Sequence, residues 1–182
     1  MQGLERYRYV SKGANDNAQN YIVAQMTALA LLGFLIPFFI GGPQILVGML
    51  VNALIIRSAI SLPAAKTLPV IFTPSIGALA HGVLFGPFSM FLVFMMPFVW
   101  AGNAILVYAF RRRIRNIYGY SLALGAGAAA KAGLLYASAY MLYSASIIPS
   151  VFLSAMGAIQ LATALLGGVV VYLELKAERY FI

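Results

Sequence analysis

Long apolar runs alternate with short polar or turn-like segments along this chain of 182 residues. An apolar run of more than about 18 residues predicts a membrane-spanning helix, because about 20 residues of helix cross a hydrocarbon core about 30 Å thick. The clearest run is 88–110, which has 23 residues without a charged side chain and is followed by arginines at 111–113 and 115. The pattern predicts six spans, at about 21–40, 45–61, 68–84, 88–110, 120–143 and 150–174.

The segments between these spans contain Gly and Pro at turn positions, such as the Gly-Gly-Pro of 41–43 and the Gly-Pro of 86–87. The second and third spans are short, so one of them could be tilted, broken or partly re-entrant. The ten-residue alternation of a transmembrane β-barrel is missing, and no strong internal repeat supports an inverted-repeat transporter. We therefore expect an all-α integral membrane domain over 21–174, between tails at 1–20 and 175–182.

Basic residues predict the orientation of this bundle. Lys and Arg concentrate in cytoplasmic loops of membrane proteins. With the N-terminus inside, eleven of the twelve basic residues fall in inner segments, and the expected outer loops 41–44, 85–87 and 144–149 contain none. We expect both termini to be cytoplasmic. The eleven residues are Arg6, Arg8, Lys12, Arg57, Lys66, Arg111, Arg112, Arg113, Arg115, Lys176 and Arg179.

Composition supports a lipid environment. The chain is 63% hydrophobic and 9% charged, whereas a soluble domain carries about 25% charged residues. The net charge of +8 lies mostly in short loops beside apolar spans, where it meets anionic lipid headgroups, so we expect no nucleic-acid partner. The first apolar run is too long for the core of a cleavable signal peptide. These features predict a multi-pass protein of the cell membrane.

Lys131 is the most informative candidate for a binding residue. It lies near the middle of the fifth predicted span, about 16 Å from either surface at helical rise, and its side chain cannot reach that far. No Asp or Glu occurs between residues 17 and 173. The Lys131 amine therefore has three alternatives: it is hydrogen-bonded by protein dipoles and water, it loses its proton, or it binds an anionic ligand. The alternatives to a ligand role are a structural lysine bonded to carbonyls or Gln160, or a different depth of this span.

Other polar side chains within the spans have a structural and a functional interpretation. Gln160, Asn103 and Asn52 either join helices by hydrogen bonds or contact a ligand. Trp100, the sole tryptophan, lies in mid-span instead of in the interfacial belt where tryptophans usually sit. It either forms the wall of a pocket or belongs to the core packing. His81, near the outer end of the third span, either lines an external mouth or faces solvent.

Several kinds of chemistry are excluded by what the sequence omits. Ion relays in membranes normally use buried carboxylates, and none is present in the spans. A single histidine rules out bis-histidine haem ligation, and the absence of cysteine rules out disulfides and thiolate metal sites. Ser75 and His81 are not on one helix face, as a hydrolase pair would need. We expect a protein without catalytic residues, metal or cofactor.

Four stretches resemble the S components of energy-coupling factor (ECF) transporters, in a poorly characterised branch of that family. They are VGMLVNAL at 47–54, FTP at 72–74, MPFVWAGNA at 96–104 and QLATALLGG at 160–168. The resemblance covers about 21–174. It implies a six-helix membrane subunit that captures a vitamin or other micronutrient from outside, and that works with a transmembrane coupling subunit and ATPase subunits.

The resemblance also implies roles for particular residues. Ala24 and Ala28 match the AxxxA motif by which the first helix docks on the coupling subunit. S components hold their substrate between the last three helices and the outer loops, so the resemblance adds weight to Gln44 and His81. The candidate binding residues are then Lys131, Gln160, Trp100, Asn103, Asn52, His81 and Gln44. The alternative functions are a membrane anchor or scaffold subunit of a larger complex and, after that, an autonomous facilitator.

Overall fold

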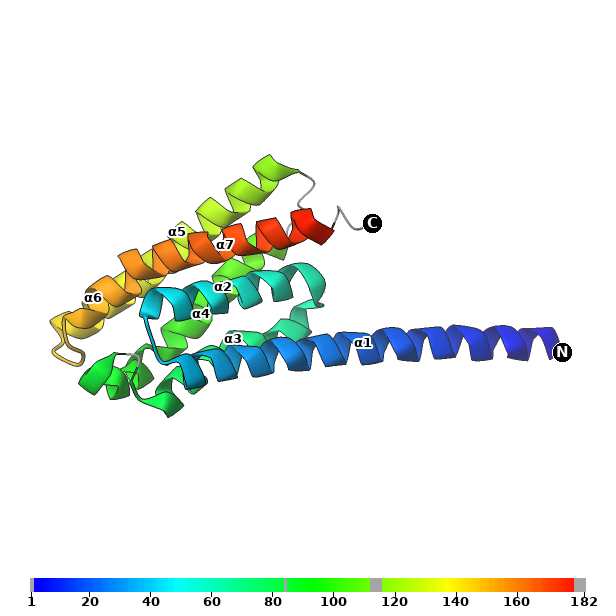
Figure 1. Cartoon of the computed structure of the whole chain (residues 1–182), viewed down its shortest axis with the longest axis horizontal. Helices are drawn as coiled ribbons and strands as arrows, with labels where there is room; N and C mark the ends of the chain where they lie inside the picture. Colours follow the sequence, from blue (N-terminus) through cyan, green and yellow to red (C-terminus); the bar gives the residue numbers. More distant parts are fainter. Residues whose placement is uncertain (1, 84, 112–115, 179–182) are drawn as a thin grey trace.

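The prediction of an all-helical chain is confirmed for the part described by the computed structural model, which is 2–83, 85–111 and 116–178, with side chains from residue 16 onward. Long helices that follow one another in the chain run in alternating directions along one axis (Figure 1). The helices are α1 (Gln2–Ile40), α2 (Gln44–Ser61), η1 (Ala64–Thr67), α3 (Leu68–His81), η2 (Gly86–Phe91), α4 (Leu92–Arg111), α5 (Ile117–Ser144), α6 (Val151–Met156) and α7 (Ala158–Glu178).

Five helical segments of the described chain are long and apolar enough to cross a membrane. The third predicted span, 68–84, is occupied by α3, whose 14 residues extend only about 21 Å at 1.5 Å per residue. That length is less than a hydrocarbon core of about 30 Å, so a sixth crossing remains a prediction. The five segments are Asp16–Ile40, Gln44–Ser61, Gly86–Arg111, Ile117–Ser144 and Val151–Glu178.

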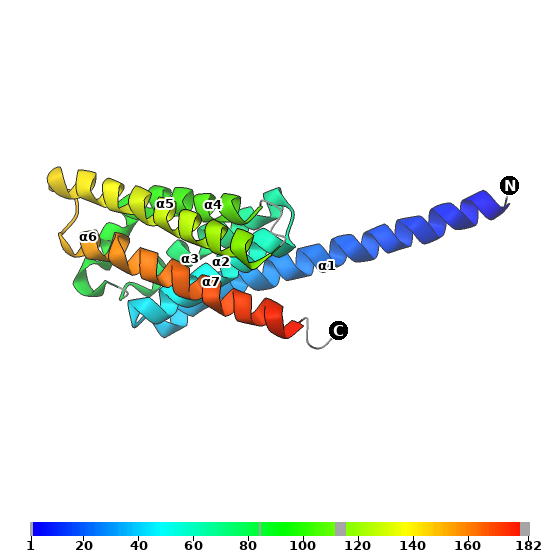
Figure 2. The same ribbon diagram turned by 90° about the horizontal axis from the view of Figure 1, so that it is seen from above.

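Both ends of the described chain lie at the same end of the bundle (Figures 1 and 2). The helix α1 continues without a break through the expected boundary at residue 20, and its first part extends past the other helices (Figure 2). The helix α7 likewise continues past residue 174. At the end of the bundle shared by the termini lie Arg57, Lys66, Arg111 and Lys176.

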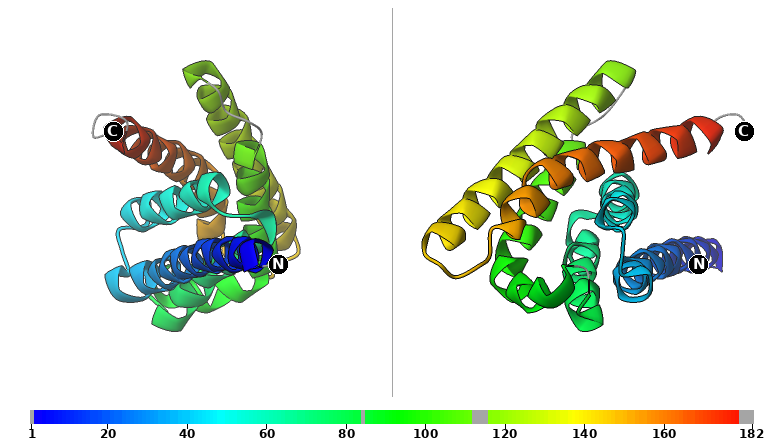
Figure 3. Two further views of the ribbon diagram at one scale, coloured as in Figure 1. Left: turned by 90° about the vertical axis from the view of Figure 1, so that its right-hand side faces the viewer. Right: turned by 60° about the vertical axis from the view of Figure 1, so that its left-hand side comes forward.

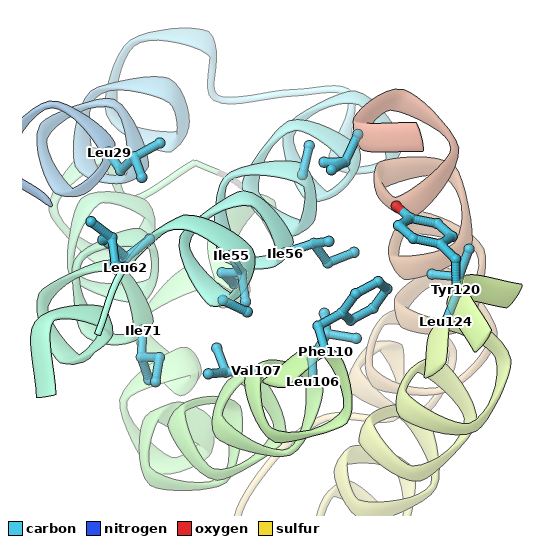
Figure 4. Packing of buried hydrophobic residues seen from close by; sticks show 14 residues of the cluster. Leu29, Ile55, Ile56, Leu62, Ile71, Leu106, Val107, Phe110, Tyr120 and Leu124 are labelled. Atoms are coloured by element: carbon cyan, nitrogen blue, oxygen red, sulfur yellow. The ribbon is translucent and has the colours of Figure 1, made fainter. Parts of the chain in front are cut away.

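Packing of the helices is dominated by three pairs, α1 with α3, α2 with α7, and α4 with α5. Seen along the bundle, α2 lies between α1 and α7 (Figure 3, left). Near the termini, an apolar cluster includes Leu29, Ile56, Phe110 and Tyr120 (Figure 4). The Tyr120 hydroxyl in this cluster donates a 2.6 Å hydrogen bond to the carbonyl of Gly168, which connects α5 to α7.

A second apolar cluster occupies the opposite half of the bundle. Its buried residues come from α3, α4, α5, α6 and the turn before α6. The two clusters leave a layer between them, and this layer contains four buried polar side chains: Asn52 of α2, Asn103 of α4, Lys131 of α5 and Thr163 of α7. The second cluster is composed of Ala78, Leu92, Met95, Leu135, Ala139, Ile148, Phe152 and Met156.

Candidate functional site

Lys131 of α5 is buried in this layer and hydrogen-bonded to two asparagines from other helices. Its side chain is 2% exposed, and Asn52 and Asn103 are 1% and 2% exposed. The Lys131 Nζ atom donates to Asn52 Oδ1 at 2.5 Å and to Asn103 Oδ1 at 2.8 Å. An ammonium group has three N–H donors, so two of them are used by these contacts. The expected alternative partners, backbone carbonyls or Gln160, are not among its hydrogen-bond acceptors in the described part.

The two asparagines are oriented by their own amide groups. Asn52 Nδ2 donates to the Gly48 carbonyl at 2.8 Å and to Thr163 Oγ1 at 3.1 Å. Asn103 Nδ2 donates to the Ile71 carbonyl at 3.1 Å. With both NH₂ groups turned to acceptors on the protein, both amide oxygens are left to face the ammonium of Lys131. We call Lys131, Asn52, Asn103 and Thr163 the lysine–asparagine cluster.

Small residues allow these helices to come close enough for the cluster to form. A Cβ atom on Gly48 would lie 2.8 Å from Thr163 Cγ2, and a Cβ on Gly167 would lie 2.7 Å from the Met49 carbonyl oxygen. The stem of Lys131 packs over Gly102, where a Cβ would be 3.2 Å from Lys131 Cγ. Close backbone approach at small residues is typical of helix pairs in membranes.

A cavity begins at the lysine–asparagine cluster and lies in the half of the bundle away from the termini. Water-sized molecules have about 80 Å³ of space in it. The cavity is lined by residues of all seven described α-helices and by Phe85. The lining residues are Pro37, Gln44, Val47, Gly48, Val51, Asn52, Pro74, Ser75, Ala78, Phe85, Leu92, Val99, Asn103, Lys131, Met156, Ile159, Gln160 and Thr163.

Irregular helix geometry shapes this cavity. Pro37 and Pro74 lie inside α1 and α3 and line it, and a proline within a helix removes one backbone hydrogen bond. The sixth predicted span is interrupted at Gly157, which separates α6 from α7. A Cβ there would lie 2.9 Å from the Leu153 carbonyl oxygen and from a ring carbon of Tyr136. The interruption precedes Ile159 and Gln160, which both contribute to the wall.

The predicted binding residues divide into two groups. Five of them line the cavity together: Gln44, Asn52, Asn103, Lys131 and Gln160. His81 lies elsewhere, against the turn between α1 and α2, where a Cβ on Gly41 would come close to its ring. Trp100 is also outside the lining and donates from Nε1 to Ser75 Oγ at 2.7 Å, with its ring edge-on to Phe72 at 5.0 Å.

Ser75 and Thr163 are two cavity residues that sequence reasoning did not select as binding residues. Each is satisfied within the protein, because Ser75 Oγ donates to the Phe72 carbonyl and Thr163 Oγ1 donates to the Gln160 carbonyl. A signal for Thr163 was its position on the helix face of Gln160 and Gly167. No comparable signal identified Ser75, whose hydroxyl lies near Trp100 only through the packing of α3 on α4.

Ala24 and Ala28 are exposed on one side of α1, one turn apart. The same side continues through the exposed residues Leu31, Leu32 and Leu35, so it forms an apolar stripe without a packing partner in the described chain. Among the described residues, no group of His, Cys, Asp and Glu is placed to hold a metal ion.

Chemically, the cavity combines one amine, that of Lys131, with a lining that has no other ionisable side chain. The lining contains no carboxylate, and most of its surface comes from aliphatic, proline and aromatic side chains. Such a concave, mostly apolar site with a few converging polar groups is typical of small-molecule binding sites. Comparisons of the chain with protein-family models, with curated proteins and with solved structures find no match.

Proposed function

We propose that this chain is the substrate-binding S component of an ECF-type importer, with six membrane crossings and cytoplasmic termini. It would bind a small micronutrient from outside and release it inward when partner ATPases act on the coupling subunit. The observation that carries the proposal is the cavity that begins at Lys131, because a buried lysine beside empty space has two amide partners on the spans but no acidic one, which leaves room for an anionic ligand.

The position of the cavity supports capture from outside. The cavity occupies the half of the bundle away from the chain ends, and the described basic residues other than Lys131 lie at the opposite end. If the basic end is cytoplasmic, as such residues are in most membrane proteins, the cavity faces the exterior. The exposed stripe with Ala24 and Ala28 offers a surface for the coupling subunit, since small residues four positions apart permit close helix contact.

The test is the small-molecule content of the purified chain. The full chain, extracted in mild detergent, is expected to release a compound that mass spectrometry detects, and Lys131→Ala is expected to abolish its retention while the protein remains monodisperse. Lys66→Ala is the matched control, because Lys66 is an exposed lysine in η1, far from the cavity. Equal retention by wild type and Lys131→Ala would contradict the proposal.

A second candidate function is a membrane anchor or scaffold subunit, and the hydrogen bonds of the cluster favour it. Lys131, Asn52, Asn103 and Thr163 connect α5, α2, α4 and α7, as interhelical hydrogen bonds do in structural bundles. In that case Lys131→Ala would lower stability, and no compound would be released from the wild-type chain. Purification of the chain with a stable protein partner and without small molecules would support this function.

A further inference from the structure

We propose that the cavity takes a monocarboxylate with an apolar body, its carboxylate bound at Lys131. This inference rests on the proposed function and names the class of substrate. Three properties of the cavity support it: its unused hydrogen-bonding capacity, its charge, and the character and length of its remaining wall.

Hydrogen bonds within the protein leave mainly donors free at the inner end of the cavity. Both N–H groups of Asn52 Nδ2 are used, and the hydroxyls of Ser75 and Thr163 each donate to a backbone carbonyl. Lys131 has three N–H groups and uses two, and Asn103 has two on Nδ2 and uses one. A ligand at this end therefore meets unused N–H donors, which pair with an acceptor group.

The charge of the site selects an anion of single charge. The lining contains one amine and no carboxylate, so a cationic ligand would bring a buried positive charge without any compensating group, whereas an anion stabilises the protonated form of Lys131. A dianion such as a phosphate monoester would leave one negative charge unpaired in a mostly apolar cavity. A carboxylate compensates the charge of Lys131, and its two oxygens can accept from both Lys131 and Asn103.

The rest of the wall fits an apolar body. Between the cluster and the start of α2, the cavity is bordered by Val47, Val51, Leu92, Val99 and Ile159. Gln44 lies eight residues before Asn52, which corresponds to about 12 Å along α2 at 1.5 Å per residue. The lining between these two residues is mostly apolar, so a ligand that extends from Lys131 toward Gln44 needs an apolar body, with a polar group tolerated only near Gln44 or Gln160.

The experiment compares matched probes on the full chain in lipid nanodiscs by equilibrium dialysis. Phenylacetate and naphthylacetate are the acids, with their primary amides and the corresponding amines as neutral and cationic analogues. We expect at least one acid to bind at least about tenfold tighter than its amide, and the amines not to compete. Lys131→Gln keeps an N–H donor without the charge and should abolish this preference, whereas Lys66→Gln should retain it.

Asn103→Asp provides a second variant in case Lys131→Gln does not fold. It places a carboxylate beside Lys131 at nearly unchanged volume and should therefore also remove the preference for acids. Binding of an amide or amine as tightly as its acid would overturn the inference, as would an undiminished preference in a folded Lys131→Gln variant.

The failure of this inference differs from that of the proposed function. A neutral or cationic compound released by wild-type protein, as identified by mass spectrometry, overturns the carboxylate assignment and leaves substrate capture standing. Wild-type protein that releases no compound and takes none of the probes overturns both.

Discussion

Gly167 of α7 lies so close to Asn52 of α2 that a Cβ atom on Gly167 would stand 2.9 Å from the Asn52 Cβ. It would also stand 2.8 Å from the Ala53 backbone nitrogen, so the obstacle is partly the backbone of α2 and not a flexible side chain. This contact holds Asn52 at the depth where its amide meets Thr163 and Lys131. The polar cluster therefore depends on a glycine that makes none of its hydrogen bonds.

Gly167→Ala should weaken the bundle and the cluster together. The added methyl group has no space, and overpacking of this kind costs about 1–3 kcal/mol. Reversible unfolding in mixed detergent micelles measures the loss. The matched control is Gly125→Ala on α5, where a Cβ would meet nothing within 4 Å. That change should leave stability unaltered or raise it by up to about 1 kcal/mol, and equal losses at both sites would contradict the close contact.

Asn103→Leu should cost about 1–3 kcal/mol of unfolding free energy for each buried polar group that it leaves unpaired. The group left unpaired is one N–H of Lys131, and the Ile71 carbonyl loses a second donor beside its helical one. For comparison, Asn116→Ala removes an exposed side chain that caps α5 by accepting from the Gly119 N–H, with an expected cost of about 1 kcal/mol. Both variants are measured by the same unfolding assay. A smaller loss at Asn103 than at Asn116 would contradict the buried arrangement.

Ser75→Ala should change the emission of the sole tryptophan. The variant removes the hydroxyl that accepts a hydrogen bond from Trp100 Nε1, and the lost bond is worth about 1 kcal/mol. Because the chain has one tryptophan, its fluorescence reports this site alone. A shift of the emission maximum is expected for Ser75→Ala and not for Ser154→Ala, which is exposed and bonds only to the Val151 carbonyl. Identical spectra for wild type and Ser75→Ala would show that the indole has another partner.

Arg57→Gln should have a small effect that depends on salt. Arg57 of α2 pairs with Glu178 at 2.7 Å and Glu174 at 3.4 Å on α7, and both glutamates are nearly half exposed. Exposed ion pairs contribute about 0–1 kcal/mol and are screened by salt. The difference in unfolding free energy between wild type and variant should therefore shrink at high ionic strength. A large difference that is insensitive to salt would mean that Arg57 is held in a less solvated site.

Cysteine labelling tests the predicted orientation directly, because the chain has no native cysteine. Lys66→Cys in η1 and Ser144→Cys at the end of α5 place single exposed thiols at opposite ends of the bundle. With cytoplasmic termini, an impermeant maleimide added to intact cells should label the second variant and not the first. Lysed cells provide the control in which both react. The reverse pattern would place the cavity on the cytoplasmic side.

The helical character of the chain was predictable from the sequence because a lipid environment leaves few choices. A backbone inside hydrocarbon must satisfy its own hydrogen bonds, so long apolar runs become helices. Their approximate bounds follow from length and from Gly and Pro in the connecting segments. Gly157 is the exception, because a lone glycine in an apolar run gives no clear sign of a break, and the close approach of Tyr136 to it is a tertiary contact.

The sequence by itself determined that a lysine lies in the middle of an apolar span without any acid to pair with it. Only the tertiary structure decided that Asn52 and Asn103 are its partners and that Trp100 and His81 lie outside the cavity. The reason is that burial in a span depends on composition, whereas a meeting of two side chains depends on how each helix is rotated about its axis and how closely it approaches its neighbour. Contacts such as that of Gly48 with Thr163 set both quantities, and residues more than a hundred positions apart in the chain form them.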